Sequence, residues 1–225
     1  MMKMFKNATR IVNNQVVAID CEMVGVDPHN TSVLAHVAIV DFFGNQIYNK
    51  YVIPPGGINS ITHERTQFSG ITKNLLRRQE ERGNALPFDT VKAEVHDILQ
   101  DKTIVGHGLE NDFKVLDYTP DDNDVWDTTK LTGYMRNHPD NEELPEGSRR
   151  KQAKKLKVLA MEIARDNIQK VTTNASGRQR STGHSPLEDA RASMNLYRIA
   201  NGFTKALYRN MAKNITPRGY QKYSS

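Results

Sequence analysis

The chain has 225 residues, of which 37% are hydrophobic and 25% charged, and this composition excludes wholesale disorder and predicts one compact domain with a buried core. Its single cysteine, Cys21, excludes an intramolecular disulfide and a zinc site built on several thiolates, which favours a reducing compartment inside the cell. The formal net charge of +5 suits a polyanionic partner such as nucleic acid, although many basic proteins bind none.

Three regions are expected along the chain: an N-terminal extension at residues 1–14, one folded domain at residues 15–205, and a helix end with a loose tail at residues 206–225. The first region carries basic residues but no apolar run of signal-peptide length. No segment approaches the ~20 apolar residues of a membrane-spanning helix. We therefore expect an intracellular protein without a membrane partner, and the nucleus, the nucleolus and the cytoplasm all stay open.

The predicted elements begin with strands and continue as a mixture of strands and helices. Runs of β-branched and aromatic residues predict three strands first, at Gln15–Val24, Val33–Phe42 and Gln46–Ile53. After a Pro-Pro-Gly-Gly breaker, the pattern predicts helices at Phe88–Leu99, from Glu110, and at Lys130–Arg136, Lys154–Ala164 and Pro186–Ile199, with short strands at Thr103–Gly106 and Val125–Asp127. This order predicts an α/β fold in which helices flank a mixed sheet.

Polar segments separate the last helices. Asn137–Arg150 and Thr172–Gly183 are predicted to be surface loops. The densest basic run consists of Arg149, Arg150, Lys151, Lys154, Lys155 and Lys157. It could follow a phosphate backbone or direct nuclear import, and a solvated helix face is the commoner explanation.

Asp20 and Glu22 lie one residue apart on the first predicted strand, so both carboxylates are expected on one face and Cys21 on the other. Two neighbouring carboxylates repel unless a cation lies between them, and Mg²⁺ and Mn²⁺ prefer oxygen ligands. The pair is therefore a candidate half of a metal site. Taken alone, a D-x-E pattern is common, and two acids on a solvated sheet face explain it more simply.

Another acid, Asp112, follows a predicted strand that ends in the turn Gly106-His107-Gly108 and leads into a helix. This order places Asp112 in the first helical turn, at the edge of the sheet. An acid in that position also complements the positive end of the helix dipole, which is the alternative explanation.

The motif GHSPLEDA fixes the start of a further helix. Ser185 is the predicted N-cap, Pro186 the first helical residue, and Glu188 the partner in a capping box. In that register His184 precedes the cap and Asp189 is the fourth helical residue, and these two positions are in contact in a hydrophobic staple. Stability does not explain a polar pair where two apolar side chains usually pack, so we expect a functional role.

Four motifs in consistent order closely resemble the DEDD-type 3′-to-5′ exonucleases of the histidine-containing subclass (DEDDh): IDCEMVGV, ERTQFSGIT, VGHGLENDF and GHSPLEDARA. The nearest resemblance is to the RNA exonuclease branch that includes the interferon-stimulated exonuclease and the Rex proteins. It extends from about Gln15 to Ala200, and the motifs are far more specific as a set than any one of them alone.

The resemblance implies a ribonuclease H-like fold with a central five-stranded mixed sheet, and a site for two divalent ions, Mg²⁺ or Mn²⁺. The implied metal ligands, which also belong to the catalytic set, are Asp20, Glu22, Asp112 and Asp189. The implied general base is His184. Three further residues are predicted to contact the substrate: Met23, Arg65 and His107.

The implied reaction is hydrolysis of phosphodiester bonds from the 3′ end of single-stranded nucleic acid, with RNA preferred to DNA and nucleoside 5′-monophosphates released. No required protein partner is evident. Two other functions stay open, a DNA exonuclease of repair or proofreading and a catalytically idle RNA-binding module. The segments at 77–86, 137–150 and 172–183 leave the shape of the substrate groove, and hence substrate preference, undefined.

Overall fold

The computed structural model describes residues 15–137, 151–169, 171–173, 179–181 and 183–203. These residues contain a central mixed sheet of seven strands in the order β5-β3-β2-β1-β6-β7, with β4 paired to β1. The strands of this sheet are β1 (Val16–Val26), β2 (Thr31–Asp41), β3 (Gln46–Ile53), β4 (Ile61–His63), β5 (Ala85–Pro87), β6 (Thr103–Gly106) and β7 (Val125–Asp127). The five expected strands form the continuous run β3-β2-β1-β6-β7, β5 adds a strand beside β3, and β4 pairs with the end of β1.

Strand β1 is the centre of the sheet, and one of its edges is only partly covered. Antiparallel β2 pairs with it along almost its whole length. On the other edge, parallel β6 pairs only as far as Ala18, and β4 pairs with Gly25 and Val26. Residues 19–24 therefore have no strand beside them on that edge within the described part of the chain, and the chain is open to other groups there.

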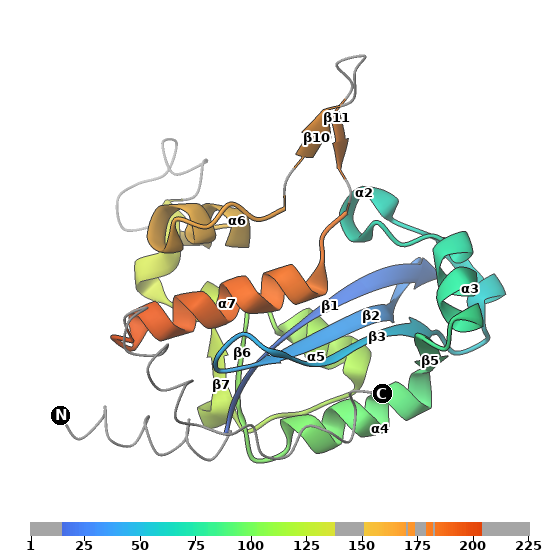
Figure 1. Cartoon of the computed structure of the whole chain (residues 1–225), viewed down its shortest axis with the longest axis horizontal. Coiled ribbons are helices and arrows are strands. Elements are labelled where there is room, and N and C mark those ends of the chain that lie inside the picture. Colours follow the sequence, from blue (N-terminus) through green and yellow to red (C-terminus); the bar gives the residue numbers. More distant parts are fainter. Residues whose placement is uncertain (1–14, 138–150, 170, 174–178, 182, 204–225) are drawn as a thin grey trace.

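Helices cover both faces of the sheet (Figure 1). The described helices are α2 (Thr66–Ser69), α3 (Lys73–Glu81), α4 (Phe88–Leu99), α5 (Glu110–Leu116), α6 (Leu156–Leu159) with the π-helical turn η7 (Ala160–Ala164), and α7 (Pro186–Ala200). Helix α7 covers one face and α4 and α5 the other, whereas α6 and η7 pack on α7. None of these described helices is long and apolar enough to cross a bilayer.

Helix α7 lies across one face of the sheet. Its buried residues Ala190 and Met194 pack on Ala18, Val40 and Val105, which are the side chains that β1, β2 and β6 turn toward it. Burying this apolar stripe removes it from water, at about 25 cal/mol per Å² of apolar surface. This packing fixes the helix over β1, so that the first turn of α7 is held in one place.

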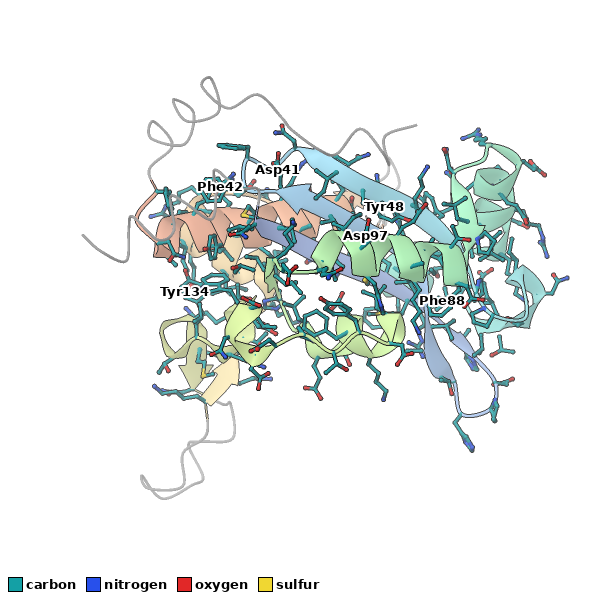
Figure 2. The ribbon with its side chains drawn as sticks, turned by 90° about the horizontal axis from the view of Figure 1, so that it is seen from below. Asp41, Phe42, Tyr48, Phe88, Asp97 and Tyr134 are labelled. Carbon is teal, nitrogen blue, oxygen red and sulfur yellow. The ribbon has the colours of Figure 1, made fainter. Side chains whose placement is uncertain are left out.

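Helices α4 and α5 cover the opposite face. The odd-numbered residues of β1, such as Val17 and Ile19, pack there against Val95 and Leu116. Figure 2 shows α4 along this side of the molecule, with Tyr48 of β3 beside it, and the Tyr48 hydroxyl donates a hydrogen bond of 2.7 Å to Glu94 Oε2. The alternation predicted for the first strand is therefore confirmed.

The predicted helix at Lys130–Arg136 is wrong. The chain forms two 3₁₀ turns, η3 (Thr128–Lys130) and η4 (Thr132–Tyr134), and then the short strand β8 (Met135–Asn137). The Asp127 carboxylate accepts a hydrogen bond from the Thr129 amide and so stabilises a turn rather than a helix. Thr132 and Gly133, both weak helix formers, further lower the helix propensity of the segment.

The predicted loop Thr172–Gly183 is also partly structured. Strands β10 (Val171–Thr173) and β11 (Gln179–Ser181) pair antiparallel within the segment Thr172–Gly183 and project away from the sheet (Figure 1). Strand β9 (Lys151–Ala153) pairs with β8 on the two sides of the predicted loop Asn137–Arg150, of which only Asn137 is described. Residues 138–150, the N-terminal extension and the expected tail at 206–225 lie outside the described residues, so those predictions stay predictions.

The segment before α7 crosses α2 at backbone contact distance. Gly183 has a positive φ of 78°, and a Cβ added there would lie 2.4 Å from Gly70 Cα and 2.8 Å from the Ser69 carbonyl carbon. The next residue, His184, donates its amide hydrogen to the Phe68 carbonyl at 2.7 Å. Only glycine fits at position 183, and its absence of a side chain lets α2 hold the start of α7.

We expect Gly183→Ala to reduce the free energy of unfolding by about 2–4 kcal/mol, because a positive φ costs alanine about 1–2 kcal/mol and the steric overlap adds more. Gly83→Ala is the matched control, since Gly83 also has a positive φ of 72° but no described atom lies within 4 Å of its added Cβ. Denaturant unfolding of both variants measures the difference. Equal losses would show that the backbones do not touch in solution.

Candidate active site

Asp20 and Glu22 lie on the β1 face that α7 covers. Cys21 between them packs in the opposite core cluster with Ile19, as the strand period predicts. Asp20 is partly buried and Glu22 is 7% exposed. Both lie in the stretch of β1 that has no strand along one edge, so their carboxylates border an open position in the sheet rather than a paired one.

Asp112 reaches the same place from the other layer. It is the third residue of α5 and is 5% exposed. The amide and the thiol of Cys21 donate hydrogen bonds to its carboxylate, so Asp112 occupies the uncovered edge of β1. Burial and the neighbouring acids raise the pKa of the Cys21 thiol well above its usual range, which keeps it protonated as a donor.

A buried carboxylate that the sequence did not single out sets the position of α5. Asp127, at the end of β7, accepts hydrogen bonds from the Gly108 amide at 2.9 Å and the Leu109 amide at 2.8 Å. These two amides belong to the turn that leads into α5. The signal available in the sequence was the run Asp127-Thr128-Thr129, which is typical of a side chain capping a turn.

His184 and Asp189 come together at the start of α7. Ser185 caps the helix by accepting from the Glu188 amide at 3.4 Å, as predicted. His184 Nδ1 lies 3.8 Å from Asp189 Oδ2, so the proximity expected from the helix register is present. The Asp189 side chain is buried at 5% exposure and the His184 side chain is 38% exposed, which leaves the ring accessible from solvent.

The four carboxylates are close enough to perturb one another. Burial, followed by the charges of Asp189 and Asp112, raises the pKa of Glu22 to about 8. Burial raises the pKa of Asp112 to about 7, although the Cys21 hydrogen bonds lower it. Burial also raises the pKa of Asp189 to about 6, and burial with the charges of the other acids raises that of Asp20 well above its usual range. The cluster therefore resists carrying its full negative charge.

The donor atoms fit a divalent cation. Glu22, His184 and Asp189 each offer one ligand atom, and these atoms lie within 4.8 Å of one another. Asp112 Oδ1 and Asp189 Oδ1 are buried, and no described residue supplies either with a hydrogen-bond partner. An unpaired buried carboxylate oxygen is costly, and hard cations prefer such oxygens. Asp20, Glu22, Asp112 and Asp189 are the residues that could hold one or two ions.

The three predicted substrate contacts have different surroundings. Met23 follows a β-bulge after Glu22 and is partly buried against the core. The Arg65 guanidinium donates to the Asn30 carbonyl and to Ser32 Oγ, which fixes it beside the turn between β1 and β2. His107 Nδ1 hydrogen-bonds Thr128 Oγ1 at 2.5 Å, which anchors its ring.

Sequence reasoning also missed Gln169. Its side-chain amide donates to Asp189 Oδ2 at 2.7 Å from a position 20 residues earlier in the chain. No local pattern in the sequence marks this residue, because the contact depends on how the segment after η7 folds back onto α7.

We expect the metal-free protein to lose stability as the pH rises from about 6.5 to about 8.5. Unfolded carboxylates titrate near pH ~4, so in this window the folded chain holds protons on Glu22 and Asp112 that the unfolded chain has lost. His36, whose pKa burial lowers to about 4, opposes this only below about pH 6.5. The measurement is the melting temperature in EDTA, which should fall by at least about 3 °C.

Glu22→Gln should flatten this pH dependence, and Glu81→Gln at an exposed helix end should not. Mn²⁺ should raise the melting temperature more at about pH 8 than at about pH 6.5, because the cation replaces the retained protons. A melting temperature that does not change with pH in EDTA would contradict the burial of these charges.

Residues 17–197 match the model of the RNase_T family, which is described as an exonuclease. Among curated proteins, human apoptosis-enhancing nuclease is 35% identical over 83% of this chain and 50% of its own length. RNA exonuclease 4 of Gibberella zeae is 37% identical over 81% of this chain and 48% of its own length. Mouse interferon-stimulated 20 kDa exonuclease-like 2 is 36% identical over 82% of this chain and 44% of its own length. The chain thus spans about half the length of the curated relatives it matches.

Solved structures share the fold at lower identity. The Saccharomyces cerevisiae Pan2 pseudoubiquitin hydrolase and RNA exonuclease module in complex with AAGGA RNA superposes with a TM-score of 0.62, at 24% identity, over 89% of this chain and 31% of that one. The Neurospora crassa Pan2 catalytic unit superposes with a TM-score of 0.59 at 21% identity, over 92% of this chain and 30% of that one. The expected ribonuclease H-like fold is confirmed, and with the family match over residues 17–197 the chain belongs to the RNase_T exonuclease family.

Proposed function

We propose that the chain is a metal-dependent 3′-to-5′ exonuclease that hydrolyses single-stranded nucleic acid, prefers RNA, and releases nucleoside 5′-monophosphates. The observation that carries this proposal is the convergence of four carboxylates and one histidine, from separate segments, at the uncovered edge of β1. Two of the relatives support RNA as substrate, since one is named an RNA exonuclease and one Pan2 structure holds RNA.

The four acids are the proposed ligands of Mg²⁺ or Mn²⁺, because both ions prefer carboxylate oxygens, and Asp112 and Asp189 each keep one buried oxygen without a hydrogen-bond partner among the described residues. When bound, two such ions supply activation of water and neutralisation of phosphate charge. The contribution of the chain is to hold Asp112 and Asp189 in fixed positions before any substrate arrives. Cys21 and Gln169 each hold one oxygen of these two acids.

His184 is the proposed general base. Burial lowers its pKa, opposed by the charge of Glu188, so the ring is neutral and able to accept a proton at pH ~7. Asp189 Oδ2 lies 3.8 Å from Nδ1, too far for a hydrogen bond but near enough for its charge to favour one orientation of the ring, and the other nitrogen is the proposed acceptor of the proton of the attacking water. The half-exposed position of the ring gives water a path to it.

Recognition of the terminal nucleotide is proposed for Met23, Arg65 and His107. Met23 directly follows the metal-ligating Glu22 and offers an apolar surface to a sugar or base. Arg65 keeps a fixed orientation through Asn30 and so could present a donor to a ribose hydroxyl. A bound 2′-hydroxyl would make RNA the better substrate.

The basic run has a smaller proposed part. Lys154 Nζ pairs with Glu162 Oε2 at 2.6 Å, and Lys157 Nζ donates to the Gln169 carbonyl at 3.0 Å. Both ammonium groups therefore have partners within the protein. Phosphate binding by this run and a nuclear or nucleolar location both stay predictions, and Arg149 and Arg150 lie outside the described residues.

His184→Ala should lower kcat by about 100-fold or more, because a general base usually contributes that much. The melting temperature should stay close to that of the parent, since the side chain is 38% exposed and does not belong to the apolar core. His96→Gln is the control, since His96 hydrogen-bonds the Leu116 carbonyl on the other face of the sheet. A kcat unchanged in His184→Ala would remove the histidine from the mechanism.

The deciding experiment is a degradation ladder on 5′-labelled single-stranded RNA and on DNA of matched sequence, with Mg²⁺, Mn²⁺ or EDTA. Stepwise shortening from the 3′ end in the presence of metal, faster on RNA, is expected. Asp112→Asn should be inactive. Faster degradation of DNA supports the alternative of a DNA exonuclease, and binding without cleavage supports an RNA-binding module.

Arg65→Ala should reduce the ratio of the RNA rate to the DNA rate by about 10-fold. The reason is that the variant would lose one hydrogen bond to the ribose hydroxyl, and about 1.4 kcal/mol corresponds to a factor of about 10. Arg77→Ala is the control, because Arg77 lies on α3 and pairs with Asn59. If Arg65→Ala slows RNA and DNA equally, its contact is with a group that both nucleic acids share, such as a phosphate.

A further inference from the structure

Gln169 joins three parts of the chain close to the proposed metal site. It lies between η7 and strand β10, and its backbone amide donates to Glu188 Oε2 at 2.8 Å. Its backbone carbonyl accepts from Lys157 Nζ, and its side-chain Nε2 donates to Asp189 Oδ2 at 2.7 Å. Two backbone bonds thus fix the position of the residue, and the side chain is used separately.

The backbone of Gln169 has an unusual conformation. Its φ is +53°, in the left-handed region, which costs a residue with a Cβ about 1–2 kcal/mol. Glycine adopts this region without strain. A position that needs only backbone hydrogen bonds would be more stable with glycine. Arg165 shares this conformation, so the contact of the Gln169 amide with Asp189, and not the strain, carries the argument.

The side chain of Gln169 gives the two carboxylate oxygens of Asp189 different surroundings. Oδ2 is held by Gln169, whereas Oδ1 is buried without a hydrogen-bond partner among the described residues. His184 Nδ1 is 3.8 Å from the same Oδ2, beyond hydrogen-bonding range. The amide of Gln169 therefore donates a hydrogen bond to Oδ2 of Asp189, which could otherwise turn toward His184.

Asp112 has the same arrangement. Hydrogen bonds from Cys21 engage its carboxylate, and its Oδ1 is buried and unpartnered. Two acids from different layers of the fold thus each have a protein donor and an unsatisfied oxygen. Carboxylates that bind metals are commonly held in this way by a hydrogen-bond donor outside the ligand set.

We propose that Gln169 is a positioning residue, which holds Oδ2 of Asp189 so that Oδ1 is free for a divalent cation. The inference rests on the proposed function, because it assigns a partner to one of the proposed metal ligands. A role limited to attaching the segment after η7 to α7 is the alternative, and the two backbone hydrogen bonds already account for that attachment.

The test is a thermal-unfolding titration of the full chain with MnCl₂, for the parent, Gln169→Glu and Gln169→Gly. Glutamate keeps the shape but replaces the donor by an acceptor, and glycine keeps both backbone bonds and relieves the strain. Both variants should need about 10-fold more Mn²⁺ for half of the rise in melting temperature. Arg165→Gly is the control, because Arg165 has the same left-handed backbone, with φ +55°, and is exposed.

A second measurement separates positioning from stability. Turnover of RNA by Gln169→Glu should fall at limiting Mn²⁺ and recover at high Mn²⁺, with the KM for RNA unchanged. If Gln169→Glu does not fold, Gln169→Gly decides. A Mn²⁺ midpoint equal to that of the parent overturns the positioning role, even if the metal-free melting temperature falls.

The two proposals fail in different ways. If the parent neither gains stability with Mn²⁺ nor cleaves RNA, the proposed function fails, and the role of Gln169 fails with it. If the parent responds to Mn²⁺ and both Gln169 variants respond in the same way, only the role of Gln169 is wrong.

Discussion

The burial of four neighbouring carboxylates in one place is the constraint on which the rest of the structure depends. Asp20, Glu22, Asp112 and Asp189 all have a raised pKa, so the fold meets a cost there that its apolar core must offset. A protein selected only for stability would place apolar side chains in this position. The cost is explained if cations supply the missing positive charge, as we propose.

The sheet creates the space for this cluster by leaving one strand partly unpaired. Strand β6 stops beside Ala18, and β4 resumes the pairing at Gly25. Between them the helix-borne Asp112 binds the backbone amide of Cys21 in place of a neighbouring strand. Helix α7 completes the arrangement from the opposite face, because its packing on the sheet fixes the position of its first turn.

Local rules explain which parts of the site could be predicted from the sequence. The two-residue period of a strand placed Asp20 and Glu22 together, and the cap at Ser185 set the register that brings His184 to Asp189. Contacts between distant segments had no such signal, which is why Gln169 was missed. The predicted helix at Lys130–Arg136 failed because a side chain outside that segment caps a turn there, and α2, α3, β4 and β5 were too short or too weakly periodic to recognise.

The backbone contact between Gly70 and Gly183 has a consequence for how the enzyme could diverge. It connects Arg65, which precedes α2, to His184, which precedes α7, through a close backbone approach and one backbone hydrogen bond. A substitution that shifts the arginine to accommodate a different sugar would also tilt the imidazole. If Arg65 and His184 act as proposed, choice of substrate and speed of reaction are linked in this chain, and new specificity should arise more readily from substitutions away from this backbone contact.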